Sequence, residues 1–187
     1  MRTERRQPFD AKSFFVDIHQ HNPHWVELFQ QTRQHLLNSE AIRAHALDIH
    51  HVGSTAIPGL DAKPIIDILI DVPSMEAADS LIPHLQKVRY EHLPQKRDYD
   101  QRRFLRRYVD PHENDHVHLT TRERNPWRER LLRFRDSLLT HPETVRAYLE
   151  LKHQLAQRYP NDRFTYGRAK DDFIQSIVEI TSLANRG

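Results

Sequence analysis

Acidic residues interrupt one apolar stretch of this sequence. Residues 65–72 read Ile-Ile-Asp-Ile-Leu-Ile-Asp-Val, a run rich in β-branched side chains and too short to span a membrane. Such a run predicts a strand that is buried on both faces of a sheet. Side chains alternate between the two faces of a strand, so Asp67 and Asp71 point to the same side, roughly 13 Å apart. We expect Asp67 inside the protein and Asp71 at the solvent-exposed end of the strand.

Helical and strand-like patterns alternate through the first part of the chain. Apolar residues recur at three- and four-residue spacing over 24–38 and 75–88, which predicts amphipathic helices. Shorter segments predict strands over 47–52, 89–94, 102–110 and 115–121. From Asn125 the pattern is helical to the end of the chain, with a second helix beginning at Pro142 and a third at Thr165.

Composition narrows the class of protein. The 187 residues contain 29% charged and 37% apolar residues, which suits a globular core with a helical appendage. No run of about 18 apolar residues exists, and no apolar stretch follows the N-terminal arginines, so we expect a cytoplasmic protein without a membrane partner. The absence of cysteine excludes disulfides and thiolate metal sites. Basic residues form no clustered face, so sequence-specific DNA binding is not expected.

A turn of small residues precedes the acidic strand. Gly53, Ser54 and Thr55 leave backbone N–H groups free of bulky side chains, as a turn that binds phosphate requires. Lys63 lies between this turn and the strand and is a candidate phosphate contact. A carboxylate in an apolar strand is unfavourable unless it is paired or binds a metal. Asp67 is therefore either a metal ligand or a structural acid that caps the Gly53 loop.

Two histidines add a second set of candidate ligands. His116 and His118 share one face of the strand predicted over 115–121. If this strand neighbours the strand of Asp67, one of the histidines completes a site with oxygen and nitrogen ligands. Imidazole favours zinc or manganese over magnesium. We take His118 as the candidate metal ligand or general base.

Several motifs together resemble one family. The segment from His51 to Leu60, followed by Lys63-Pro64-Ile65-Ile66-Asp67, is similar to the GrpB family of the nucleotidyltransferase (polymerase-beta-like) superfamily. Further matching segments include 116–119, 148–152 and 166–170. The last of these is prominent in the family, which implies that Lys170 points into the cleft.

The resemblance implies a fold and a division of the chain. The fold is α/β (α+β), with a nucleotidyltransferase-like mixed sheet flanked by helices and a C-terminal helical segment. We divide the chain into an N-terminal arm (1–22), the α/β core (23–124) and C-terminal helices packed on the core (125–187).

The acidic pattern departs from that of active nucleotidyltransferases. Those enzymes carry Asp-x-Asp or Asp-x-Glu and a third acid, which together hold two divalent ions around the transferred phosphoryl group. Leu69 stands here in the place of the second acid. The metal site is therefore incomplete, and catalytic activity does not follow from the resemblance.

Two hypotheses remain open. As an enzyme, the protein would transfer a nucleotidyl group from a nucleoside triphosphate to an unknown acceptor, with Asp67 and His118 as catalytic residues that hold Mg, Mn or Zn. As a binding module, the same cleft would hold a nucleotide or another phosphorylated small molecule without turnover. In both cases the residues expected to contact the nucleotide are Gly53, Ser54, Thr55, Lys63 and Lys170.

Overall fold

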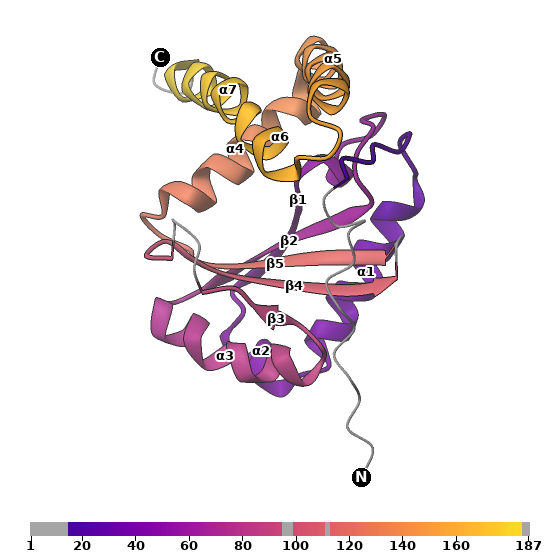
Figure 1. The fold of residues 1–187 in the computed structure, drawn as a ribbon. Helices are drawn as coiled ribbons and strands as arrows, with labels where there is room; N and C mark the ends of the chain where they lie inside the picture. Colours follow the sequence, from indigo (N-terminus) through magenta and orange to yellow (C-terminus); the bar gives the residue numbers. More distant parts are fainter. Residues whose placement is uncertain (1–14, 95–98, 111–112, 185–187) are drawn as a thin grey trace.

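A mixed β-sheet with helices on both faces forms the body of the protein (Figure 1). The computed structural model describes residues 15–94, 99–110 and 113–184. Residues 1–14 of the predicted N-terminal arm lie outside the described residues. The strands are β1 (Asp48–Val52), β2 (Ile65–Val72), β3 (Glu91–His92), β4 (Arg102–Asp110) and β5 (Glu113–Thr121). The helices are α1 (His24–Leu37), α2 (Glu40–His45), the short 3-10 helix η2 (Ser54–Ala56), α3 (Met75–Lys87), α4 (Pro126–Thr140), α5 (Pro142–Arg158), α6 (Arg163–Ala169) and α7 (Asp171–Ala184).

The most apolar strand lies inside the sheet. The strand order is β1-β2-β5-β4-β3, with β2 and β5 parallel and every other pair antiparallel. The parallel register sets Asp67 beside His116 and Leu69 beside His118. The mixed sheet and the expected pairing of these two strands are therefore confirmed.

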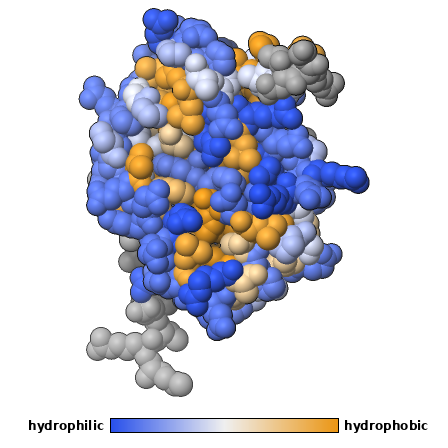
Figure 2. Space-filling view, turned by 180° about the vertical axis from the view of Figure 1, so that it is seen from behind, coloured by the Kyte–Doolittle hydropathy of each residue, from blue (hydrophilic) through white to orange (hydrophobic). Residues whose placement is uncertain are grey.

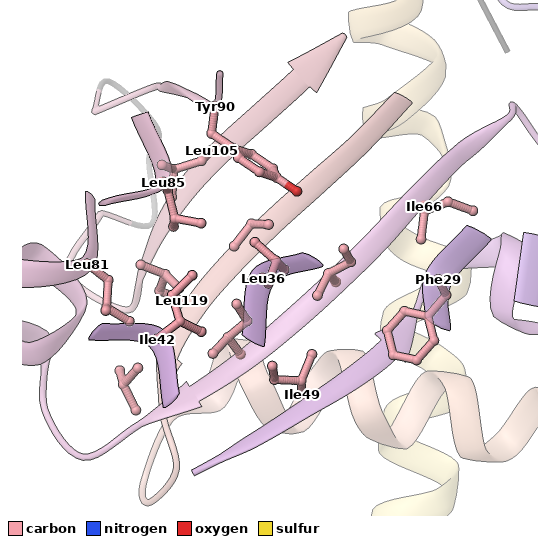
Figure 3. Packing of buried hydrophobic residues seen from close by; sticks show 14 of the residues in the cluster. Phe29, Leu36, Ile42, Ile49, Ile66, Leu81, Leu85, Tyr90, Leu105 and Leu119 are labelled. Atoms are coloured by element: carbon pink, nitrogen blue, oxygen red, sulfur yellow. The ribbon is translucent and has the colours of Figure 1, made fainter. Parts of the chain in front are cut away.

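The side chains on the two faces of β2 pack against different layers of helices. Its even-numbered residues, Ile66, Ile68, Ile70 and Val72, join a core with side chains of α1, α2 and α3. Figure 3 shows part of this core, where Ile66 lies near Phe29 and where Leu36 of α1 and Ile42 of α2 pack on the sheet. The odd-numbered residues face the side covered by α4 to α7 (Figure 1). Both acids of the strand are therefore directed toward the C-terminal helices.

A second apolar cluster attaches the C-terminal helices to the sheet. Ile57 and Leu60, in the loop between η2 and β2, pack with Leu138 of α4 and Tyr148 of α5. All four are buried, with exposed fractions of 3% or less. The loop that follows Gly53 is thus fixed between the sheet and these helices.

Three details differ from the sequence-based prediction. The strand predicted over 89–94 is reduced to the two residues of β3. The helix predicted from Thr165 begins at Arg163 and is divided into α6 and α7 at Lys170. Asp171 and Asp172 stand in the first turn of α7, where acidic side chains favour a helix start, so the second helix has its own N-terminal signal.

Asp71 is buried, so its prediction as a solvent-exposed acid is wrong. Its exposed fraction is 0%, because Arg128 of α4 covers that end of β2. The guanidinium group of Arg128 donates two hydrogen bonds to the Asp71 carboxylate, from Nε to Oδ1 and from Nη2 to Oδ2, each 2.7 Å long. His50 Nε2 lies 3.2 Å from Oδ2. Burial raises the pKa of Asp71, but hydrogen bonds from His50 and Arg128 outweigh burial and hold that pKa below its usual value.

The surface is mainly hydrophilic on the face seen from behind, with smaller apolar areas between the polar residues (Figure 2). No helix in the described part of the chain has the length and apolar character needed to cross a membrane.

The Arg128–Asp71 pair gives a test of the fold. Replacing Arg128 with alanine leaves a buried carboxylate without its cation, and we expect the free energy of unfolding to fall by about 3 to 5 kcal/mol. Urea denaturation at pH 7 measures this change. Arg130→Ala is the matched control on the same helix, because Arg130 pairs with Asp171 at the surface, and its loss should stay within about 1 kcal/mol. Equal losses in the two variants would contradict the role given to Asp71.

Candidate functional site

A pocket lies between one end of the β2–β5 pair and helices α5 and α6. Its volume is about 140 Å³. It brings together side chains from η2, the loop before β2, both central strands, α5 and α6. Its lining consists of Ser54, Thr55, Ala62, Lys63, Ile65, Asp67, His116, Lys152, Arg163, Tyr166 and Lys170. Six of the residues singled out in the sequence therefore meet here: Ser54, Thr55, Lys63, Asp67, His116 and Lys170.

The charge of this pocket is strongly unbalanced. Its lining carries four cationic side chains, Lys63, Lys152, Arg163 and Lys170, and one carboxylate, Asp67. The cations come from four places in the chain: the loop before β2, the middle of α5, and the start and the end of α6. Cations held this close repel one another, and an anion between them would relieve that repulsion.

This environment lowers the pKa of two of the lysines, Lys63 and Lys152. Burial, together with repulsion from Arg163 and Lys170, lowers the pKa of Lys63 to about 7. Burial also lowers the pKa of Lys152 to about 7, again with a contribution from Lys170. Lys152 is almost completely buried and donates a hydrogen bond to the backbone carbonyl of Asp61.

Asp67 stays ionised at the wall of the pocket. His116 Nδ1 donates a hydrogen bond of 3.1 Å to Asp67 Oδ1, and His118 Nε2 lies 3.6 Å from the same oxygen. Burial raises the pKa of Asp67, but the two histidines lower it to well below its usual range. The carboxylate side chain is 29% exposed, so it is accessible to a ligand.

The structure explains why a glycine stands at position 53 and a threonine at position 55. Gly53 has a φ of +73°, and a Cβ added to it would overlap Asp67 Oδ2 and lie 3.0 Å from Asp67 Cγ. Only glycine therefore allows the carboxylate to lie against the turn. The Thr55 hydroxyl donates to the carbonyl of Ile65 at 3.0 Å and accepts from His51 Nε2 at 3.1 Å. Gly53 is absent from the pocket lining, whereas Ser54 is part of it.

The contacts of His118 fix its tautomer, so that the protonated ring nitrogen, Nε2, faces Asp67. Arg102 donates a hydrogen bond to His118 Nδ1, so the neutral ring carries its proton on Nε2. Burial lowers the pKa of His118 to about 4, which keeps the ring neutral at pH 7. The His118 ring is stacked on the Trp127 ring, with the two ring centroids 5.2 Å apart. His118 is absent from the pocket lining, and its protonated Nε2 faces Asp67 from 3.6 Å, beyond the range of a normal hydrogen bond.

This geometry fits the predicted divalent ion poorly. A metal ligand needs a free nitrogen lone pair, and both ring nitrogens of His118 are engaged. Across residues 15–94, 99–110 and 113–184, no group of three or more histidine, aspartate or glutamate side chains is arranged to hold a metal ion. An ion on Asp67 and His118 would require the contact with Arg102 to change. No chemical step is therefore assigned to a metal ion held by Asp67 and His118.

The pocket also contains three residues that the sequence did not single out as ligand contacts: Lys152, Arg163 and Tyr166. Lys152 had a usable signal, because it lies in the buried stripe of α5 between Tyr148 and Leu155. A lysine on the apolar face of a helix needs a partner, which points to a site. Arg163 had no such signal, since only the fold of α6 over the sheet brings it to the pocket.

The contact between Gly53 and Asp67 can be tested with a pair of glycine variants. Both Gly53 and Gly59 have positive φ, +73° and +76°, but a Cβ at Gly59 would meet nothing within 4 Å. Each substitution by alanine carries the penalty of a left-handed residue, about 1 to 2 kcal/mol. We expect Gly53→Ala to lower the free energy of unfolding by about 1 to 3 kcal/mol more than Gly59→Ala, because it also overpacks Asp67. Equal losses measured by urea denaturation would contradict the close packing.

Comparisons with known proteins place this chain in a family. The family model described as GrpB protein matches residues 15–179. A UPF0157 protein of Pseudomonas aeruginosa is 36% identical over 174 residues, which cover 91% of this chain and 69% of that protein. A dephospho-CoA kinase of Mycolicibacterium paratuberculosis is 30% identical over 179 residues, which cover 82% of this chain but 43% of that protein.

A solved structure agrees with the fold. The crystal structure of the conserved protein GrpB from Enterococcus faecalis has a TM-score of 0.79 and 32% sequence identity to this chain. The match covers 91% of this chain and all of that one. The resemblance found in the motifs around Gly53 and Asp67, and the α/β fold it implied, are confirmed. The chain belongs to the GrpB family.

Proposed function

We propose that this protein binds the phosphate end of a nucleotide, or of another phosphorylated small molecule, in the pocket beside Asp67. The observation that supports this proposal is the set of four cations from separate segments that surround one carboxylate. Phosphate groups carry the charge density and the multiple acceptor oxygens that such a set can pair with. Arg163 adds a planar fork suited to phosphate recognition.

The dimensions of the pocket favour the charged end of a ligand. Pockets that enclose a drug-sized ligand have volumes of about 300 to 1,000 Å³, whereas this one has about 140 Å³. We therefore expect the phosphates to be enclosed and the rest of the ligand to lie outside. Ser54 also lines the pocket, and its hydroxyl can donate a further hydrogen bond to a phosphate oxygen.

Isothermal titration calorimetry with adenosine, AMP, ADP, ATP, tripolyphosphate and dephospho-CoA tests this proposal. Dephospho-CoA belongs in the set because one relative bears the name dephospho-CoA kinase. Affinity should increase with the number of phosphates, and adenosine should not bind. Arg163→Gln should weaken tripolyphosphate binding by about 10-fold or more, since a hydrogen bond to a charged group contributes about 1.5 to 3 kcal/mol. Arg168→Gln is the control, because Arg168 belongs to the same helix but not to the pocket.

Two results would contradict phosphate binding. The first is equal affinity for adenosine and ATP, which would place recognition on the nucleoside. The second is an equal effect of the Arg163 and Arg168 variants, which would indicate a general response to surface charge and not a defined site.

Nucleotidyl transfer to an acceptor is a second proposal at the same site. The ionised Asp67, exposed in the pocket wall, supports it. Because Leu69 stands in the place of the second acid and Asp71 is paired with Arg128, a divalent ion such as Mg, Mn or Zn would come with the nucleotide and take most of its ligands from phosphate and water, as Mg²⁺ commonly does. Such an ion neutralises charge on the phosphoryl group.

Asp67→Asn separates the two proposals. If the protein only binds phosphate, the loss of one negative charge should strengthen tripolyphosphate binding severalfold, because the remaining lining is cationic. If the protein transfers nucleotides, the same variant should abolish the metal-dependent release of pyrophosphate from a nucleoside triphosphate. Pyrophosphate release that is unchanged in Asp67→Asn would exclude this carboxylate from the chemistry.

A further inference from the structure

Lys63 differs in its contacts from Lys152, the most deeply buried lysine of the pocket. The Lys63 side chain forms no hydrogen bond or ion pair with any residue that the structure describes; its contact is with the Tyr166 ring, whose centroid lies 5.3 Å from Nζ. Lys170 Nζ lies 4.5 Å from the centroid of the same ring. Lys152, by contrast, donates to the backbone of Asp61. Lys63 is therefore a pocket lysine whose nitrogen, like that of Lys170, contacts the Tyr166 ring and forms no hydrogen bond or ion pair with the described residues.

This environment favours the neutral amine. Two cations, Arg163 and Lys170, repel an ammonium at Lys63, and burial removes the water that would stabilise it, so the pKa falls to about 7. At pH 7 about half of the Lys63 side chains then carry a free lone pair, against roughly one in 2,500 for an ordinary lysine with a pKa near 10.4. Enzymes activate lysine nucleophiles by this combination of burial and a neighbouring cation.

We propose that Lys63 is a nucleophile that forms an imine with an aldehyde or ketone carried by a phosphorylated ligand. The inference rests on the proposed function, because Arg163 and Lys170 would hold the phosphate while the carbonyl group reaches Lys63. The Lys63 nitrogen attacks the carbonyl carbon with its lone pair, and the C=O π electrons move to oxygen. The carbinolamine then loses that oxygen as water, which carries away both hydrogens of the amine, and a C=N bond remains. The step is reversible and needs no oxidant or reductant.

Pyridoxal 5′-phosphate, an aldehyde with a phosphate group, is the probe for this reaction. The protein is incubated with the probe at pH 7.5, the imine is trapped with sodium borohydride, and the modified lysine is located by peptide mass spectrometry. The sequence holds six lysines, so the sites are readily distinguished. We expect the adduct on Lys63 to exceed that on every other lysine at least tenfold. Pyridoxal, which lacks the phosphate, should label Lys63 at least tenfold less.

Lys63→Arg is the matched variant, because it keeps the positive charge but cannot form an imine. It should lose the adduct. Arg168→Gln, on α6 but outside the pocket, should keep the adduct on Lys63. Adducts on Lys152 or Lys170 in place of Lys63, or spread evenly over the lysines, would overturn the inference.

The outcomes also separate this inference from the proposed function. If tripolyphosphate binds but no adduct forms on Lys63, phosphate binding stands and the nucleophile is excluded. If pyridoxal and pyridoxal 5′-phosphate label Lys63 equally, and tripolyphosphate does not protect it, Lys63 is reactive but the phosphate site is excluded.

Discussion

The structure depends on compensating two carboxylates in a strand that is covered on both faces. An ionised acid in such a strand is unfavourable without a partner, and each acid of β2 finds one from a distant part of the chain. Asp71 is paired with Arg128, which joins α4 to the sheet. Asp67 is hydrogen-bonded by His116 of the parallel strand β5. The same odd-numbered face of β2 thus has a structural end at Asp71 and an accessible end at Asp67.

The accessible end is where positive charge gathers. Helices α5 and α6 bring Lys152, Arg163 and Lys170 over the sheet, and Lys63 approaches from the loop before β2. Like charges are not placed together for stability, since their repulsion opposes folding. Their gathering around one carboxylate is therefore the feature that indicates an anionic ligand, and the local sequence around Gly53 serves mainly to let Asp67 lie against the turn.

The histidines show how neighbouring contacts limit chemistry. His116 and His118 share a face of β5, as a metal site would require, but each directs a ring nitrogen at the same carboxylate oxygen. Arg102 fixes the tautomer of His118 from behind. The pair therefore orients Asp67 and holds it in its ionised form, and the lining cations make the pocket more suited to an anion than to a preformed divalent ion.

Local patterns in the sequence determined the elements of this fold and one side of its site. The apolar run around Asp67 defined β2 because a strand buried on both faces must be apolar throughout, and the turn at Gly53 and the motifs beside it identified the family. The burial of Asp71 and the positions of Arg163 and Lys152 were decided only by the tertiary structure. Arg128 lies 57 residues after Asp71 in the sequence. Helix α6 begins at Arg163, whereas β5 ends at Thr121. No local pattern specifies such contacts, because they arise when the C-terminal helices bury their apolar faces on the loop at Ile57 and Leu60.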